Sequence, residues 1–262
     1  MLNILVCVKQ VPDVNLVKID PETGSLIRKG VPAILNPLDA NALEAAVQVK
    51  EQYGGTVTCI TMGPDQAAEA LRECLAAGAD RAVLLSDRAF ANADTLATSY
   101  VLVSAASQLG SFDLIFCGKE SLDGATGQMG AQLAERFGAS LLSSTTKVLS
   151  VDTTRQTVIV ERELLNGIET VEAQLPCLFT VEKTNYHPRI PNLKRWKASR
   201  SAEITVYNSK TIPGLDETQI GDPGSPTKVP RTYPPVVGEG GLMLDEGSVP
   251  QNVEKLLSLL EL

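Results

Sequence analysis

The sequence predicts an α/β protein, in which a mostly parallel sheet carries helices on both faces and continues into an antiparallel extension and a C-terminal arm. Short apolar runs alternate with amphipathic stretches from residue 3 to residue 138, as in parallel sheets. From about residue 140 the apolar residues alternate with polar ones, as in hairpins. Nine of the fifteen prolines follow residue 184, where we expect an arm and not a second core.

The first half of the chain predicts four strands, a small hairpin and four helices. Strands are expected at 3–8, 56–63, 81–87 and 112–119, and a hairpin with a Pro-Glu-Thr-Gly turn at 16–28. One helix is expected from a cap at Asp39 to Gly54, with Ala42, Ala45, Ala46 and Val49 on its buried face. The next begins at Pro64 and ends at Gly78, another is capped by Asp94, and the fourth starts between Thr126 and Gly130.

The second half predicts antiparallel strands and then the arm. Strands are expected at 140–151, 157–164 and 168–173, with a type I′ turn at Asn166-Gly167. A last helix from near Ser248 places Val253, Leu256, Leu257 and Leu260 on one stripe, which either packs on its own domain or is covered by a partner. We therefore divide the chain into an α/β domain, residues 1–184, and a partner-binding segment, residues 185–262.

Composition narrows the class of protein. The 262 residues are 44% hydrophobic, and the formal net charge of −8 argues against binding nucleic acid. The five cysteines are far apart and form no CxxC pair, so we expect buried thiols and no metal or disulfide framework. The N-terminus carries no basic leader and no run of the ~20 apolar residues that span a bilayer. We expect a cytoplasmic protein without membrane insertion.

The stretch 118–130, GKESLDGATGQMG, leaves a strand and enters a helix through three glycines. In an open α/β sheet ligands bind outside the carboxyl ends of the strands, where a helix N-terminus offers free N–H groups to an anion. Gly124, Gly127 and Gly130 would let backbone amides approach a phosphate, although such a loop can also be purely structural.

Several nucleotide and catalytic sites are excluded by missing motifs. The chain has no GxxxxGK[ST] loop, no GxGxxG after the first strand and no Ser-Gly-Gly-x-Asp-Ser loop, so we expect any bound nucleotide not to be cleaved. The single histidine, His187, lies beside Pro188 in the arm, which argues against a histidine triad or a histidine-rich metal site.

An isolated basic segment, residues 188–200, surrounds the only tryptophan, Trp196. Such a run can simply be solvated. Here Ile190 and Leu193 are interleaved with the charges, and apolar anchors inside a basic rim are typical of docking surfaces.

In this order the motifs resemble the β (small) subunit of electron transfer flavoproteins, of the electron-bifurcating, two-FAD type, over nearly the whole chain. The resemblance rests on residues 6–13, 36–46, 61–64, 77–85, 118–130, 160–181 and 190–197. It implies a fold related to the adenine-nucleotide α-hydrolase group. The family's acidic pair after Glu-Arg-Glu is replaced here by Leu165 and Asn166.

The resemblance also implies the site residues. An adenine nucleotide would lie over the first strand and contact Cys7, Val8, Lys9, Asn36, Pro37, Leu38, Asp39, Met62, Gly118, Asp123, Gly124, Ala125, Thr126, Gly127, Gln128, Met129 and Gly130. Arg162 would approach the flavin of the α subunit, and the arm would wrap that subunit. Ile190, Pro191, Asn192, Leu193 and Arg195 would dock an acyl-CoA dehydrogenase.

Two cofactor states are open within the family. In bifurcating members the β subunit holds its own FAD, takes a hydride from NADH and divides the electrons between ferredoxin or flavodoxin and the α-subunit FAD. In the others it holds a structural AMP. Residues 11–39 and Gly124 resemble the bifurcating branch. A third hypothesis comes from another class of protein, a free-standing nucleotide-binding stress-type protein. Such a protein would lack the arm, so the arm argues against it.

Overall fold

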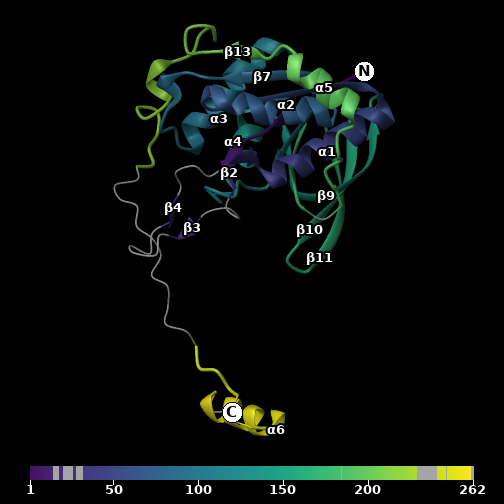
Figure 1. Ribbon diagram of the computed structural model, residues 1–262. Helices are drawn as coiled ribbons and strands as arrows, with labels where there is room; N and C mark the ends of the chain where they lie inside the picture. The colour runs from purple at the N-terminus through teal and green to yellow at the C-terminus, as the bar shows by residue number, and fades with distance from the viewer. Residues whose placement is uncertain are drawn as a thin grey trace.

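The structure is a computed structural model, and it describes residues 1–13, 18–19, 26–27, 32–183, 185–228, 241–245 and 247–260. In this part of the chain, nine strands form one sheet with the order β11-β10-β9-β12-β8-β1-β6-β7-β13, and helices cover both faces (Figure 1). The strands of the sheet are β1 (Leu2–Cys7), β6 (Gly55–Met62), β7 (Arg81–Leu85), β8 (Leu114–Gly118), β9 (Ser140–Asp152), β10 (Thr157–Leu164), β11 (Gly167–Gln174), β12 (Cys177–Val181) and β13 (Thr205–Tyr207).

The described helices and short strands complete the fold. The helices are α1 (Pro37–Tyr53), α2 (Ala68–Ala77), α3 (Thr95–Ala106), α4 (Met129–Phe137), α5 (Leu193–Ser201) and α6 (Val249–Leu259). Single 3₁₀ turns are η2 (Asp65–Ala67), η3 (Arg88–Phe90), η4 (Ser107–Leu109) and η5 (Glu217–Gln219). Outside the large sheet, β2 (Gln10–Pro12) pairs with β5 (Ala33–Leu35), and β3 (Lys18–Ile19) with β4 (Leu26–Ile27).

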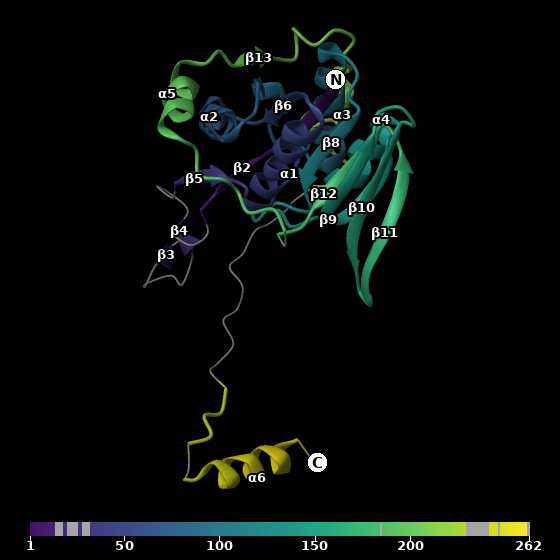
Figure 2. The same cartoon turned by 90° about the vertical axis from the view of Figure 1, so that its right-hand side faces the viewer.

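The predicted fold class is confirmed. Seven neighbouring strands, β9-β12-β8-β1-β6-β7-β13, are parallel to one another. Strands β10 and β11 extend the sheet beyond β9 by antiparallel pairing. The β10–β11 hairpin projects beyond the sheet in Figure 2. The pairing of β3 with β4 confirms the small hairpin, while its predicted turn lies outside the described residues.

Two apolar layers hold the helices against the sheet. On one face Ile4 and Val6 of β1 pack with α1 and α2, and on the other Leu5 of β1 packs with α3 and α4. Phe116 and Phe179 stack on neighbouring strands in the first layer, with ring centroids 4.5 Å apart. All five cysteines are free and buried, as the sequence predicted.

The chain reverses direction across the sheet at β1. After β1 it adds β6 and β7 on one side, then returns to place β8 on the other side. Loops that leave β1 and β8 therefore diverge at the carboxyl edge of the sheet. Ligands bind at such a reversal point in open α/β sheets.

Two helix starts differ from the sequence prediction. The N-cap of α1 is Asn36 and not Asp39, because Pro37 occupies the first helical position, where its missing N–H costs no hydrogen bond. Pro64 precedes η2, and α2 begins at Ala68. The Asp94 cap of α3 is confirmed, since its carboxylate accepts from Leu96 N and Ala97 N.

Two features of the second half also differ. The β10–β11 hairpin turns through Leu165 and Asn166, with Leu164 opposite Gly167. The type I′ prediction is wrong, because it requires a positive φ at both Asn166 and Gly167, and only Gly167 has one. Strand β12 was not predicted as a separate element, although it lies between β8 and β9. All five of its residues are buried, so it shows no alternating pattern.

The segment after residue 184 contributes to the α/β body up to residue 228. Strand β13 pairs with β7 at the sheet edge, and Tyr186, Ile212 and Ile220 are buried in the two apolar layers. Helix α6 lies apart from the sheet in Figures 1 and 2, and the side chains of its predicted stripe are 44–57% exposed. In the described residues no helix is long and apolar enough to cross a membrane.

Candidate functional site

A buried carboxylate connects the loops that leave β1 and β8. Asp39, in the first turn of α1, accepts from the backbone N–H of Lys9 at 2.8 Å through Oδ2 and from that of Gly118 at 2.9 Å through Oδ1. Burial raises the pKa of Asp39 to about 7, while the two backbone hydrogen bonds favour its ionised form. Both carboxylate oxygens accept hydrogen bonds from the backbone, so Asp39 shapes the site by fixing the two loops.

Asn36 connects the same two loops one turn earlier. Its side chain is fully buried, its Nδ2 donates to Glu120 O at 2.9 Å, and its Oδ1 accepts from Leu122 N at 3.2 Å. Its backbone N–H donates to Lys9 O at 2.9 Å. The Asn-Pro-Leu-Asp turn thereby fixes the position of the loop that follows β8.

An ion pair joins the two loops over the reversal point of the sheet, a region that we call the crevice. Lys9 Nζ lies 2.7 and 2.8 Å from the two carboxylate oxygens of Asp123. The side chains are 46% and 34% exposed, so this pair contributes about 1 kcal/mol or less to stability. The Lys9 ammonium therefore stays accessible to a competing anion.

The loop 119–128 is mostly exposed and contains unusual backbone angles. Ala125 and Gly127 have φ values of 45° and 62°, and the space beside the Gly127 Cα is open. The N–H groups of Thr126 and Gly127 donate to no described residue. The first N–H groups of α4, from Met129 onward, have no partner within the helix. These donors and the helix dipole suit an anion such as a phosphate.

Gly118 and Gly130 are required by packing. A Cβ at Gly118 would meet Asp39 Oδ1 at 2.6 Å, and one at Gly130 would overlap Thr180 Cγ2 of β12. Gly130 thus brings α4 close to the sheet. The sequence prediction placed Gly130 among the phosphate contacts and did not foresee its packing against β12.

Sequence reasoning missed a contribution from the start of α3. The Thr95 hydroxyl donates to Gln128 Oε1 at 2.8 Å and accepts from Gln132 Nε2 at 3.1 Å. The buried Gln132 Oε1 has no hydrogen-bond partner among the described residues, which leaves an acceptor for a ligand or water at this place. The signal that could have found Thr95 is its position: a capped helix start after β7, at the same edge of the sheet.

The other predicted site residues lie around this crevice. Cys7 and Val8, at the end of β1, are buried, and Pro37, Leu38 and Met62 are half-buried at the edge of the sheet. Burial raises the pKa of the Cys7 and Cys117 thiols, so both stay protonated and neither offers a thiolate. The structure thus brings the ends of β1, β6 and β8 and the starts of α1, α3 and α4 together.

The remaining predicted residues lie elsewhere. Arg162 on β10 forms an ion pair with Glu169, directly opposite on β11. Ile190 and Leu193 are 95% and 78% exposed. Asn192 caps α5 by accepting from Arg195 N at 2.9 Å. An apolar pair is therefore presented on a rigidly capped helix start.

Comparison with known proteins gives the family. A model of the electron transfer flavoprotein domain matches residues 23–211. The chain belongs to the electron transfer flavoprotein family. Its function is accordingly electron transfer of the kind that this family performs.

Three relatives show how far the likeness extends. The chain is 45% identical to the caffeyl-CoA reductase-Etf complex subunit CarD of Acetobacterium woodii, over 99% of this chain and 98% of that protein. It is 44% identical to the electron transfer flavoprotein subunit beta of Thermoanaerobacterium thermosaccharolyticum, over 99% and 98%. It is 42% identical to protein FixA of Azotobacter vinelandii, over 88% and 83%.

Proposed function

We propose that this chain is the β subunit of an electron-bifurcating electron transfer flavoprotein and holds FAD in the crevice above β1 and β8. With an α subunit it takes a hydride from NADH. It delivers electrons to ferredoxin or flavodoxin and, through the α-subunit FAD, to an acyl-CoA dehydrogenase. The observation that carries this proposal is the loop 118–130, held by Asn36 and Asp39 over the reversal point of the sheet.

The residues of the crevice fit the diphosphate of a dinucleotide. The free amides of Thr126 and Gly127 and the start of α4 form a donor set for phosphate oxygens. Lys9 would exchange part of its pairing with Asp123 for the phosphate charge. Thr95 orients Gln128 at the rim, and the unpartnered Gln132 Oε1 lies behind it.

FAD, when bound, supplies the hydride-accepting and one-electron chemistry. The chain supplies position and electrostatics. Gly124 is exposed, and a Cβ there would meet only Ser121 Oγ at 3.4 Å, so Gly124 adds neither bulk nor charge at this point of the loop. We expect no side chain of this chain to act as an acid or base.

One relative, CarD, supports bifurcation over a plain carrier. CarD is named as part of a complex with a caffeyl-CoA reductase. The alternative is a non-bifurcating β subunit with a structural AMP. The Thermoanaerobacterium relative is consistent with this alternative, because its name gives an electron transfer flavoprotein subunit beta and no further partner. Both nucleotides would use the same phosphate donors.

The family resemblance also assigns surfaces of this chain to two partner proteins. The exposed apolar face of α6 would pack on the α subunit, and Arg162, held by Glu169, would approach its flavin. Ile190, Pro191, Asn192, Leu193 and Arg195 would dock the dehydrogenase. The cytoplasm is the expected compartment.

The nucleotide site is tested by a matched pair of glycine variants. Gly127 and Gly138 both have a φ of 62° with open space beside them, at opposite ends of α4. Alanine at either position pays a similar backbone cost of about 1–2 kcal/mol. We expect Gly127→Ala to weaken FAD or AMP binding by about tenfold in calorimetry, and Gly138→Ala to leave affinity unchanged. Equal losses in both variants would argue against the phosphate site.

A further inference from the structure

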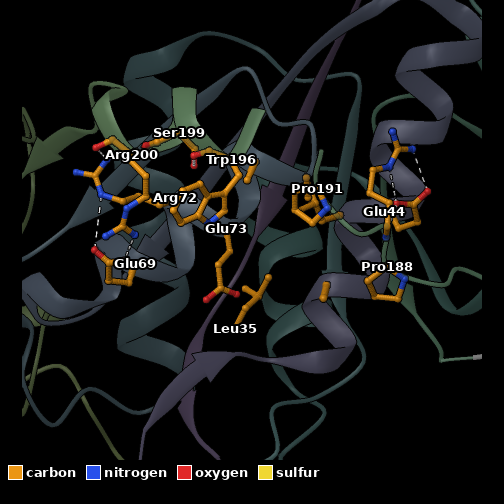
Figure 3. Close-up of a pocket in the computed structure, with 15 residues that line it drawn as sticks. Leu35, Glu44, Glu69, Arg72, Glu73, Pro188, Pro191, Trp196, Ser199 and Arg200 are labelled. Carbon is orange, nitrogen blue, oxygen red and sulfur yellow. Dashed lines mark hydrogen bonds and ion pairs between the residues drawn. The ribbon is translucent and has the colours of Figure 1, made fainter. Parts of the chain in front are cut away.

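A cavity of about 320 Å³ lies behind the proposed docking segment, between α1, α2 and α5 (Figure 3). Its walls are largely apolar. They include Leu35, Leu43, Ala76, Pro188, Pro191 and Trp196. Pro191 also belongs to the proposed docking set, so the cavity is continuous with that surface.

The arginines at the cavity are already paired. Arg189 contacts Glu44 at 2.8 Å and Glu51 at 2.6 Å on α1. Arg200 contacts Glu69 at 2.6 Å. These ion pairs hold the segment and α5 against the two helices and leave the cavity between them.

Arg72 is engaged at the other end of α5. Its Nη1 donates to the carbonyl oxygens of Ser199 at 2.8 Å, Arg200 at 3.1 Å and Ala202 at 3.3 Å. The guanidinium thus satisfies carbonyls that the helix end leaves free. These contacts direct it toward the end of α5.

Glu73 remains as the one lining carboxylate without a hydrogen bond or ion pair to a described residue. Its side chain extends into the space bordered by Trp196 and Leu35 in Figure 3. Partial burial raises the pKa of Glu73, and the nearby Glu69 carboxylate raises it further. Glu73 is exposed as a residue, so water solvates its carboxylate when no partner is bound, and a cation placed beside it would offset both effects.

We propose that this cavity receives a lysine or arginine side chain of the protein that docks on residues 188–197, with Glu73 as its counter-ion and Trp196 as its aromatic wall. Such a side chain matches the cavity in both parts. Its alkyl stem packs on apolar walls while its cationic head meets a carboxylate and an aromatic ring. A neutral apolar side chain would leave Glu73 unpaired and partly desolvated.

The site gives the docking surface a specific charge pattern. The exposed basic residues Lys194, Arg195 and Lys197 favour an acidic partner surface. A single cation inserted at Glu73 would favour one register of that partner, because an alignment that moved the cation onto the basic residues would place like charges together. This inference rests on the proposed docking role of the segment.

The cavity is tested first on the full-length chain alone. Trp196 is the only tryptophan, so tryptophan fluorescence reports on the cavity wall itself. The probes are N-acetyl-lysine amide and N-acetyl-arginine amide at constant ionic strength, with N-acetyl-norleucine amide as the neutral comparator. We expect a saturable change with the two cationic probes and none with the neutral one.

Two variants decide the role of Glu73. We expect Glu73→Gln to weaken binding of the cationic probes by about tenfold. Glu203→Gln, at an exposed glutamate just after α5 that does not line the cavity, should leave it unchanged. The proposal is wrong if the cationic probes give no saturable change, if norleucine amide acts equally, or if both variants behave alike.

A second measurement separates this inference from the docking proposal. In the complete flavoprotein, Glu73→Gln should raise the KM for the dehydrogenase without changing kcat, and Ile190→Ala should do the same if the segment docks it. An unchanged KM in Ile190→Ala would refute docking, while the probe titration would still decide the cavity. An unchanged KM in Glu73→Gln alone would refute the cation pocket in the complex.

Discussion

At the scale of single residues, Asp39 is the group on which the shape of the crevice depends most. Its two oxygens hold the loops after β1 and β8, and burial raises its pKa to about 7. Because the pKa in the folded state is above its ordinary value, the folded state binds the proton more tightly. The stability that this group contributes is full at low pH and is lost as the pH rises from about 4 to about 7.

Asp39→Asn tests this linkage. We expect the free energy of unfolding of the natural chain to fall more between pH 4 and pH 7 than that of the variant, measured by urea denaturation. The variant should also lose about 1–3 kcal/mol, because an amide nitrogen cannot accept from a backbone N–H. Parallel pH profiles of the two chains would contradict the assignment.

Gly130 provides a second residue-scale prediction. Gly130→Ala should destabilise the chain by about 1–3 kcal/mol, since the new methyl group overlaps Thr180 Cγ2. Gly124→Ala, whose Cβ finds ordinary space, is the matched control. Adding Thr180→Ser removes the clashing methyl group and keeps the hydroxyl that accepts from Ser144 N, so the double variant should recover most of the loss. No recovery would show that α4 is held away from β12 by another contact.

At the scale of elements, local signals in the sequence predicted where α1 and α2 end and where α3 begins, but not the starts of α1 and α2 and not all of the sheet. Gly54 and Gly78 end α1 and α2, and Asp94 caps α3, because each acts on its own neighbours. The role of Asp39 was predicted wrongly as a helix cap. The two backbone N–H groups that donate to its carboxylate, those of Lys9 and Gly118, lie 30 and 79 residues away in the sequence. The position of β12 could not be predicted from local sequence either, since its pairing with β8 and β9 depends on distant segments of the chain.

The same limit applied to the candidate site. The glycine-rich loop and the turn at residues 36–39 could be found from the sequence. The Thr95 contacts with Gln128 and Gln132 could not, because they join two helix starts that only the fold brings together. Pairing of Arg189 with Glu44 and Glu51 was also hidden, since a basic run in a sequence carries no mark of its acidic partners.

That pairing predicts how the docking segment is held. Glu44 is only 6% exposed as a residue, and Arg189→Ala would leave its carboxylate without a cation. We expect a loss of about 2–4 kcal/mol and faster hydrogen exchange in α5. Arg189→Lys keeps the charge but cannot bridge both glutamates with a planar fork, so it should recover only part of the loss. Unchanged hydrogen exchange in α5 would show that contacts other than those of Arg189 hold the docking segment.

At the scale of the whole molecule, α6 is an amphipathic helix with its apolar face uncovered in the described structure. Val253, Leu256, Leu257 and Leu260 are all at least 44% exposed. Leu256→Asp with Leu257→Asp should therefore abolish co-purification of the α subunit and leave the unfolding of this chain nearly unchanged. Ser258→Asp, which changes charge on the same helix outside that set, is the control. Retained co-purification would assign the stripe to another surface.

The identity and amount of the nucleotides bound to the native complex decide between the bifurcating and the non-bifurcating subunit. The chain would be tagged in its host, purified with the subunits that accompany it, and denatured to release its nucleotides for chromatography. We expect two FAD for each pair of α and β subunits and no AMP. One FAD and one AMP would contradict bifurcation and leave the crevice as a structural nucleotide site.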